Sequence, residues 1–290
     1  MTSKINKQRI RDDFSQAANS YDAAAIVQHE ICDRTLERVD MLKLQPATIL
    51  DIGTGTGRSL LGLRSRFPES SIFACDIALP MLHQCRENLV IKDARRLICN
   101  DAELLPIADE SIDLIFSTST FQWCADLNQV LSECKRVLCL NGALIFSTFG
   151  PDTLLQLRNS WAQVDDRQHV HDFMDMHHIG DMMLAMQLLD PVVDMQIIDI
   201  HYQSLRQLLQ DLKDTGSRGK FTTSESNKSP GLMSKEKYQR LVQAYEKYRE
   251  DGSLPVSYEV IYGYARKSAN IQKAGKDNEV RIPVSSIKKA

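Results

Sequence analysis

Short apolar runs alternate with amphipathic segments through the first half of the chain. The apolar runs predict buried strands at residues 48–51, 71–75, 96–99, 112–117 and 143–148. Between them, apolar positions recur every three or four residues and predict helices at residues 58–67, 80–90 and 126–138. This alternation is typical of a parallel sheet with helices on both faces. The dipeptide Asn141-Gly142 predicts the turn out of the last of these helices.

The flanking segments carry their own patterns. Residues 8–40 are expected to be helical, and their apolar positions are Phe14, Ala17, Ala18, Tyr21, Ile26, Ile31, Leu36 and Val39. Beyond Gly150 the pattern predicts helices at 152–161, 179–189, 204–212 and 234–250, and strands at 192–199 and 256–264. A polar stretch rich in Gly, Ser, Thr and Lys at 213–231 indicates a mobile loop. Residues 268–290 are polar and lysine-rich, and we expect them to be disordered.

The first predicted strand leads into the most informative motif of the chain. Thr48 to Gly57 read Thr-Ile-Leu-Asp-Ile-Gly-Thr-Gly-Thr-Gly, so an acid, Asp51, precedes Gly53, Gly55 and Gly57 on a strand-to-helix turn. Glycine there permits positive φ and lets a ligand lie against bare backbone. An acid is a poor neighbour for phosphate and a good one for a ligand that carries an ammonium and a sulfonium group. The motif therefore predicts S-adenosylmethionine rather than NAD or ATP as the cofactor.

Two further acids end the next two predicted strands. Asp76 lies 19 residues beyond Gly57, which is the position of an acid that accepts from both ribose hydroxyls. The third strand runs into Asn100-Asp101-Ala102-Glu103, where Asp101 is placed to accept from the exocyclic amine of adenine. Because the carboxyl ends of parallel strands meet at one edge of a sheet, we expect these residues to share one site.

Composition narrows the class of protein. A net charge of −3 and a pI near 6.2 over 290 residues argue against a generic nucleic-acid binder. No apolar run reaches membrane-spanning length, and residues 1–11 lack the apolar core of a secretory signal, so we expect a cytoplasmic protein. The seven cysteines form no Cys-x-x-Cys pair and are expected to be reduced. The spacing of His169, His171, His177 and His178 does not match a zinc site, so no metal is expected.

The glycine motif, Asp76 and the run from Asp101 to Pro106 resemble class I S-adenosylmethionine-dependent methyltransferases, of the branch that contains the ubiquinone and menaquinone enzymes. Narrower motifs resemble the malonyl-acyl carrier protein O-methyltransferases of biotin synthesis, and they are Phe14-x-x-Ala17-Ala18-x-x-Tyr21-Asp22, Phe121-Gln122-Trp123, Phe149-Gly150-Pro151-Asp152-Thr153-Leu154 and residues 175–181. The resemblance implies an α/β Rossmann-like fold with a seven-stranded, mostly parallel sheet and a helical lid. It divides the chain into an N-terminal helical segment over the cofactor (1–47), a methyltransferase domain (48–266, lid about 200–251) and a disordered tail (267–290).

The resemblance also implies roles for individual residues. Cofactor contacts fall on Asp51, Gly53, Gly55, Gly57, Asp76, Asp101 and Ala102. Near the transferred methyl group it places Tyr21, Gln122 and Trp123, which position the substrate. Substrate or carrier-protein contacts are expected from Arg167, His171, Lys213, Arg218 and Lys220. The acceptor would be the carboxylate of a malonyl thioester on acyl carrier protein, which is ionised at pH 7 and requires no general base.

Two alternatives share these motifs. One is a methyltransferase that acts on a quinone precursor. The other is a respiratory complex I assembly factor of the same fold that acts as a protein-arginine hydroxylase, since the run Phe149-Gly150-x-Asp152-Thr153-Leu154 and the closing strand resemble it as well.

Overall fold

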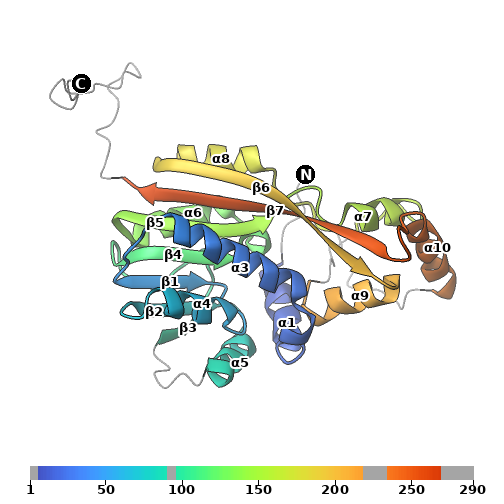
Figure 1. The fold of residues 1–290 in the computed structure, drawn as a ribbon, viewed down its shortest axis with the longest axis horizontal. Coiled ribbons are helices and arrows are strands. Elements are labelled where there is room, and N and C mark those ends of the chain that lie inside the picture. Colours follow the sequence, from blue (N-terminus) through green and yellow to red (C-terminus); the bar gives the residue numbers. More distant parts are fainter. Residues whose placement is uncertain (1–5, 90–95, 218–233, 269–290) are drawn as a thin grey trace, which may run out of the picture.

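The strands of the protein form one seven-stranded sheet in the order β3-β2-β1-β4-β5-β7-β6 (Figure 1). The structure is a computed structural model that describes residues 6–89, 96–217 and 234–268. Its strands are β1 (Thr48–Ile52), β2 (Ser71–Asp76), β3 (Leu97–Cys99), β4 (Ile112–Thr118), β5 (Leu138–Phe149), β6 (Leu188–Tyr202) and β7 (Leu254–Lys267). β1 to β5 pair in parallel, whereas β7 runs antiparallel to both β5 and β6. The predicted seven-stranded, mostly parallel sheet is confirmed.

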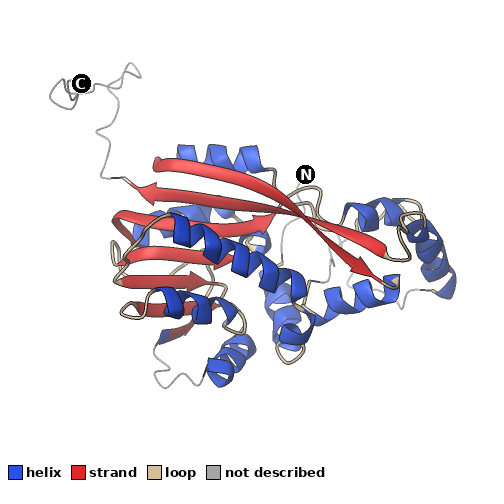
Figure 2. Ribbon diagram, in the orientation of Figure 1, coloured by secondary structure: helices blue, strands red, loops and turns tan. Residues whose placement is uncertain are grey.

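Helices cover both faces of the sheet (Figure 2). They are α1 (Lys7–Ala17), α2 (Tyr21–Ala24), α3 (Ile26–Met41), α4 (Arg58–Arg66), α5 (Leu79–Leu89), α6 (Leu127–Val137), α7 (Leu155–Ala162), α8 (Met176–Ala185), α9 (Leu205–Asp214) and α10 (Lys235–Glu246). Consecutive strand residues point to opposite faces, so Ile49 belongs to the apolar cluster that includes residues of α3 and α4, whereas Leu50 belongs to the cluster that includes residues of α6 and α8. Both side chains are fully buried, which explains why the strands are apolar without alternation.

The predicted helical region over residues 8–40 is helical but is not one continuous helix. The chain forms three helices, because it leaves helical geometry between α1 and α2 and again at Ala25, whose ψ is 39°. The breaks let α3 pack along the sheet while α1 lies at the carboxyl ends of the strands (Figure 1). Ile26, which the pattern assigned to the buried face, is 58% exposed at the start of α3.

Two other boundaries differ from the prediction. Asn141-Gly142 lies inside β5 rather than in a turn before it, and Asn141 has a left-handed φ of 63°. The pairing of β5 with β4 shifts register at this point, so the dipeptide forms a bulge. The helix predicted at 179–189 ends earlier, since α8 stops at Ala185 and β6 already begins at Leu188.

The far ends of β6 and β7 extend beyond the other strands and carry α7, α9 and α10 (Figure 1). α9 and α10 follow β6 in the chain and precede β7, within the segment for which a lid is predicted. Residues 218–233 of that segment, and 269–290 of the predicted tail, lie outside the described residues. The division of the chain into three regions stays a prediction. Within the described part of the chain, no helix is both long and apolar enough to span a membrane.

Candidate functional site

The glycine motif forms a tight turn at the carboxyl end of β1. Gly53, Gly55 and Gly57 all have positive φ, at 73°, 53° and 94°. A side chain on Gly53 would bring its Cβ within 1.9 Å of Thr120 Oγ1, whereas at Gly55 the same position meets no atom within 4 Å. The backbone of Gly55 is therefore open to a ligand. Gly57 serves packing instead, because its Cβ would lie 2.7 Å from Cys85 Sγ of α5.

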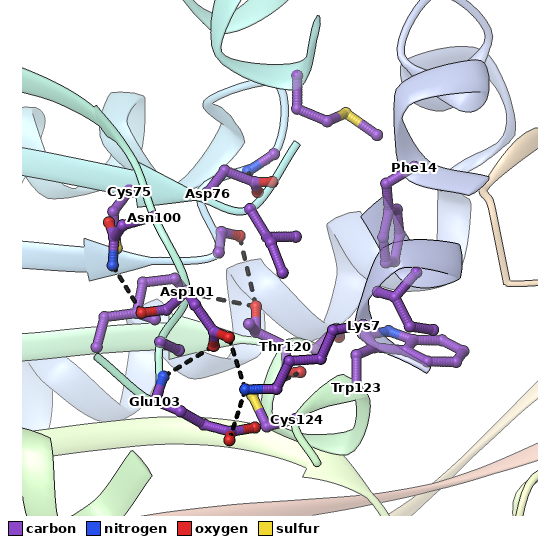
Figure 3. A pocket seen from close by; sticks show the side chains of 18 of the residues that line it. Lys7, Phe14, Cys75, Asp76, Asn100, Asp101, Glu103, Thr120, Trp123 and Cys124 are labelled. Carbon is purple, nitrogen blue, oxygen red and sulfur yellow. Dashed lines mark hydrogen bonds and ion pairs between the residues drawn. The ribbon is translucent and has the colours of Figure 1, made fainter. Parts of the chain in front are cut away.

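A cavity, here called the first cavity, opens beside this turn (Figure 3). Polar groups on its wall come from the ends of β1, β2, β3 and β4 and from Lys7 of α1, and apolar groups come from the N-terminal helices, from α5 and from Trp123. Its lining includes Lys7, Ile10, Phe14, Tyr21, Gly53, Gly55, Asp76, Met81, Asn100, Asp101, Ala102, Glu103, Thr120, Trp123 and Cys124. The cavity thus joins segments that are far apart in sequence, as expected for the carboxyl edge of a parallel sheet.

Asp76 lies on the wall of the first cavity, at the end of β2. One carboxylate oxygen accepts from the backbone N–H of Gly55 at 2.9 Å, and the other accepts from that of Ala78 at 2.8 Å. Burial raises the pKa of Asp76 to about 6, although these backbone donors favour the charged form. Two donors fix the carboxylate, and each oxygen keeps lone-pair capacity for a ligand hydroxyl.

Asp51 lies beneath the glycine turn and does not line the first cavity. The Ser59 hydroxyl donates to one of its oxygens, and burial raises its pKa to about 6. Among the described residues, the other oxygen, Oδ1, has no hydrogen-bond partner, and neither has Thr54 Oγ1 of the turn. Buried polar atoms are normally satisfied. These two atoms therefore fit a site that a polar ligand or its bridging water completes.

Asp101 forms an ion pair with a lysine of the N-terminal helix α1. Its carboxylate and that of Glu103 both lie 2.6 Å from Lys7 Nζ of α1 (Figure 3). The second Asp101 oxygen accepts from the backbone N–H of Glu103 at 3.0 Å. The acid that was expected to meet an adenine amine is thus also the residue that fastens α1 across the first cavity.

A second set of contacts fastens α2. Asp22 accepts a hydrogen bond from the Thr56 hydroxyl of the glycine turn and another, at 2.9 Å, from Asn88 Nδ2 of α5. These bonds hold the preceding residue, Tyr21, against the first cavity. Burial, followed by the charges of Asp76 and Asp22, raises the pKa of Tyr21 well above its usual value. Its hydroxyl therefore stays protonated at neutral pH and can donate a hydrogen bond, but it does not act as a base.

Trp123 and Gln122 are neighbours in the short helix η2 (Phe121–Trp123) but face different cavities. Trp123 lines the first cavity and contacts Phe14 of α1 edge to face, with ring centroids 5.8 Å apart. Gln122 lines a second cavity together with Thr148, whose hydroxyl donates to Gln122 Oε1 at 3.1 Å. Gln122 Nε2 donates to the Ser119 carbonyl at 2.8 Å, so the amide is fixed in orientation.

The second cavity lies on the other side of η2, under α8. Apolar side chains dominate its wall, and they are Phe121, Leu127, Phe173, Met174, Ile179 and Met182. His171 also lines it, and its ring stacks on Trp123 at a centroid distance of 6.2 Å. Burial lowers the pKa of His171, so the ring is neutral at pH 7. Cys124 lines both cavities, which makes them neighbours.

The remaining predicted contacts do not join this site. Arg167 is exposed in a third cavity near α7, apart from the wall that His171 shares with Trp123. Lys213 is exposed in the last turn of α9. Arg218 and Lys220 lie outside the described residues. Within residues 6–89, 96–217 and 234–268, no group of three or more His, Cys, Asp or Glu side chains is arranged to hold a metal ion.

Comparisons with known proteins agree with this geometry. A family model described as "Methyltransferase domain" matches residues 50–146, which include the glycine turn, Asp76 and Asp101. A malonyl-[acyl-carrier protein] O-methyltransferase of Gallionella capsiferriformans is 42% identical over 271 residues, which cover 91% of this chain and 92% of that protein. This chain belongs to the malonyl-[acyl-carrier protein] O-methyltransferase family. It is also 37% identical, over 98% of its length and 96% of the relative, to malonyl-[acyl-carrier protein] O-methyltransferase 1 of Coxiella burnetii.

Solved structures of low identity support the fold alone. The YcgJ protein of Bacillus subtilis matches with a TM-score of 0.57 at 15% identity, over 82% of this chain and all of that one. A Haemonchus contortus phosphoethanolamine N-methyltransferase 2, solved with S-adenosyl-L-methionine, matches with a TM-score of 0.51 at 19% identity, over 82% of this chain and 53% of that one. The class I methyltransferase fold that the motifs predicted is confirmed.

Sequence reasoning missed several residues of the first cavity in this family member. Lys7 stands 94 residues before Asp101, and nothing in its local sequence indicates that pairing. Thr120 and Cys124 flank a recognised motif, but only the structure brings Thr120 within reach of Gly53. A search for hydroxyl and thiol groups around Phe121-Gln122-Trp123 would have found both.

Proposed function

We propose that this protein transfers a methyl group from S-adenosylmethionine to the free carboxylate of a malonyl group carried by acyl carrier protein, an early step of biotin synthesis. The observation that carries the proposal is identity of about 40% over nine-tenths of the chain with relatives named for that reaction. The first cavity, with an apolar second cavity beside it, supports the proposal independently.

The residues of the first cavity suit the proposed cofactor. Gly53 and Gly55 would lie against its methionine part, and Asp76 would accept from both ribose hydroxyls. Asp101 and the backbone of Ala102 would meet the adenine, whose faces would contact Met81 and Phe14. Asp51 would act from beneath the turn, through its unpartnered oxygen, on the ammonium group. When bound, the cofactor supplies an electrophilic methyl group, whose bond to sulfur breaks as the bond to the acceptor oxygen forms.

The second cavity suits a carboxylate acceptor. Its apolar wall would strip water from the carboxylate, which makes the oxygen more nucleophilic. Within the described residues, no lysine or arginine lines this cavity, and His171 is neutral. A strong cation would hold the ionised carboxylate more tightly than the transition state, in which its charge falls, and would slow the reaction. No general base is needed, because the acceptor is already ionised.

Four side chains would orient the two reacting groups at the boundary between the cavities. Tyr21 would donate from the side of the N-terminal helices. Trp123 and His171, stacked on each other, would form the wall against which the malonyl group lies. Gln122 would keep Thr148 and the η2 backbone in place through its two hydrogen bonds. These roles are positional, and catalysis rests on alignment and desolvation.

The proposal is tested by intact-mass analysis of malonyl-acyl carrier protein after incubation with the protein and S-adenosylmethionine. We expect a gain of one methyl group that an esterase removes, and no gain with acetyl-acyl carrier protein, which lacks the carboxylate. A Tyr21→Phe variant should bind the cofactor but transfer methyl groups more slowly. Cofactor binding without any methylation of malonyl-acyl carrier protein would contradict the proposal and favour the quinone or protein-arginine hydroxylase alternatives.

A further inference from the structure

The three cavities are neighbours, because successive ones share a lining residue. The first and second share Cys124, and the second and third share Asp172. The third cavity lies between α7 and the loop that follows it, and its lining includes Arg158, Trp161, Asp165, Arg167, Gln168 and His169. A chain-like ligand that reaches the first cavity through the second therefore has its other end at the third.

Two donors in the third cavity have no acceptor. Arg158 Nε and Gln168 Nε2 are buried, and neither makes a hydrogen bond to any described residue. The terminal nitrogens of Arg158 donate to the Pro151 carbonyl at 2.7 Å and to the His171 carbonyl at 3.2 Å. Among the described residues Arg158 forms no ion pair with a carboxylate, and these two carbonyls hold its guanidinium in place. Arg167 adds an exposed guanidinium to the same wall.

The acids around the third cavity do not neutralise these donors. Asp165 is occupied by Lys237 Nζ at 2.8 Å and by His169 Nε2 at 2.7 Å. Although burial favours its neutral form, these two partners hold the pKa of Asp165 well below its usual range. Asp166 and Asp172 are exposed to solvent. The unpartnered donors are thus one guanidinium N–H, at Arg158 Nε, and the amide Nε2 of Gln168, a donor set that suits phosphate oxygens.

We propose that the third cavity binds the phosphate of a phosphopantetheine arm, whose chain follows the second cavity and delivers its thioester-bound acid to the first. This inference rests on the proposed function, since it concerns the arm on which that acceptor is carried. The arm has a phosphate at one end, two amides in its middle and the thioester at the other end. Arg158, Arg167 and Gln168 meet the phosphate, and Asp172 lies where an amide N–H of the arm passes.

The rim of the third cavity is where the carrier protein itself would then dock. Two cations of α10 and the lysine that follows it bond to the segment just after α7: Lys237 to Asp165, Arg240 to the Gln163 carbonyl at 3.0 Å, and Lys247 to Gln163 Oε1 at 2.6 Å. α7 and α10 lie side by side at one end of the molecule (Figure 1). An acidic carrier surface suits such a rim.

Three malonyl thioesters test the inference: those of N-acetylcysteamine, pantetheine and 4′-phosphopantetheine, each assayed for kcat/KM with S-adenosylmethionine. The readout is the phosphate advantage, defined as kcat/KM for the phosphopantetheine thioester divided by that for the pantetheine thioester. We expect at least about a tenfold advantage in the wild type, because charge-assisted hydrogen bonds to a phosphate are strong. Arg158→Gln should reduce it to near one. Arg64→Gln, an exposed arginine on α4 at the opposite end of the molecule (Figure 1), should retain it in full.

Arg158 also holds backbone carbonyls, so the double variant Arg167→Gln, Gln168→Ala carries the test if Arg158→Gln fails to bind cofactor. A severalfold loss of the phosphate advantage in that double variant supports the inference. An unchanged advantage in the variants, or no advantage in the wild type, overturns it while leaving methyl transfer to malonyl thioesters intact. If the wild type methylates none of the three thioesters and no malonyl-acyl carrier protein, the proposed function fails, and the inference fails with it.

Discussion

Asp76→Asn separates the cofactor role of this residue from its role in folding. The substitution keeps the shape of the side chain but replaces one acceptor oxygen with an NH₂ donor. In the wild type, one carboxylate oxygen is held by the N–H of Gly55 at 2.9 Å and the other by that of Ala78 at 2.8 Å. Under the proposed cofactor geometry, the variant loses one charge-assisted hydrogen bond to a ribose hydroxyl and weakens the other. This should cost about 2–4 kcal/mol, or roughly a 30- to 1000-fold rise in Kd.

The stability of the cofactor-free Asp76→Asn protein should not fall with its cofactor affinity. Burial raises the pKa of Asp76 from 3.8 to about 6, so its ionisation at pH 7 costs the folded protein about 3 kcal/mol relative to the unfolded chain. Asparagine removes that cost, but it leaves one backbone N–H without an acceptor, at about 1–3 kcal/mol. We therefore expect the cofactor-free variant to have a free energy of unfolding equal to the wild type or up to about 2 kcal/mol higher.

Isothermal titration calorimetry with S-adenosylmethionine measures the affinity, and urea unfolding followed by circular dichroism measures the stability. Asp190→Asn is the matched control, because Asp190 is exposed and pairs with Arg266 at 2.8 Å on the surface. It should change neither quantity appreciably. If a folded Asp76→Asn protein bound the cofactor within threefold of the wild type, the assignment of Asp76 to the ribose would be refuted.

Four further outcomes follow from the site. Gly53→Ala should abolish cofactor binding, because the new Cβ would lie 1.9 Å from the Thr120 hydroxyl. Gly252→Ala is its control, since Gly252 has a similar φ of 78° and no atom within 4 Å of that position; it should lower the free energy of unfolding, measured by thermal unfolding, by only about 1–2 kcal/mol. Lys7→Met should speed release of S-adenosylhomocysteine severalfold in stopped-flow fluorescence while changing stability by less than about 1 kcal/mol, since the ion pairs are partly exposed; equal release rates would contradict its role in closing the first cavity. Asp22→Ala should lower kcat about tenfold, because the bonds from Asp22 to Thr56 and Asn88 that hold the neighbouring Tyr21 in place are lost. The cofactor Kd should change little, because the proposed cofactor contacts are kept; an unchanged kcat would contradict the role of Tyr21 in the site. Calorimetry across pH should show cofactor affinity falling below pH 6 as Asp76 and Asp51, whose pKa values burial raises to about 6, are protonated. The cofactor-free protein instead gains stability from these carboxyls as pH falls from 6 to 4, because the folded state binds their protons more tightly; a flat affinity profile would mean that neither carboxylate is needed.

The parts of the site that could be predicted are those that a local pattern and one topological rule place together. The sequence pattern predicts where a strand ends in an acid and where it is followed by glycines and a helix. The rule that parallel strands end at one edge then joins Gly55, Asp76 and Asp101. All three line the first cavity. The rule does not resolve side-chain direction, so it did not reveal that Asp51 points beneath the turn or that Gly57 packs on α5.

The break in the N-terminal helix could not be predicted locally. Residues 17–26 contain neither glycine nor proline and include five alanines, so helix propensity favours continuation. Long-range bonds from Asp22 to Thr56 and Asn88 hold α2 in its observed place instead. Tertiary contacts of this kind override propensities that differ by only a few tenths of a kcal/mol per residue.

The sequence likewise did not show that adjacent residues of η2 face different cavities. Sequence resemblance put Gln122 and Trp123 together near the methyl group, but successive residues of a 3₁₀ turn point about 120° apart. Trp123 consequently faces the first cavity and Gln122 the second. Because its residues face both ways, η2 forms the wall between the two cavities. The motif Phe121-Gln122-Trp123 does not by itself indicate that arrangement.

Under the proposed function, the charges that line the two cavities favour binding of the cofactor before the malonyl acceptor. Asp76, Asp101 and Glu103 line the first cavity, and Lys7 is the one lysine or arginine among its described lining residues. The second cavity has no lysine or arginine among its described residues, and Asp126 and Asp172 lie at its exposed rim. A malonyl carboxylate that enters alone therefore meets carboxylates and no free positive charge, because Lys7 is already paired with Asp101 and Glu103. A sulfonium held beside Trp123 provides that charge, and methyl transfer removes it together with the charge of the acceptor. The same walls thus favour the acceptor only when the methyl donor is in place, and they no longer attract the ester once it has formed.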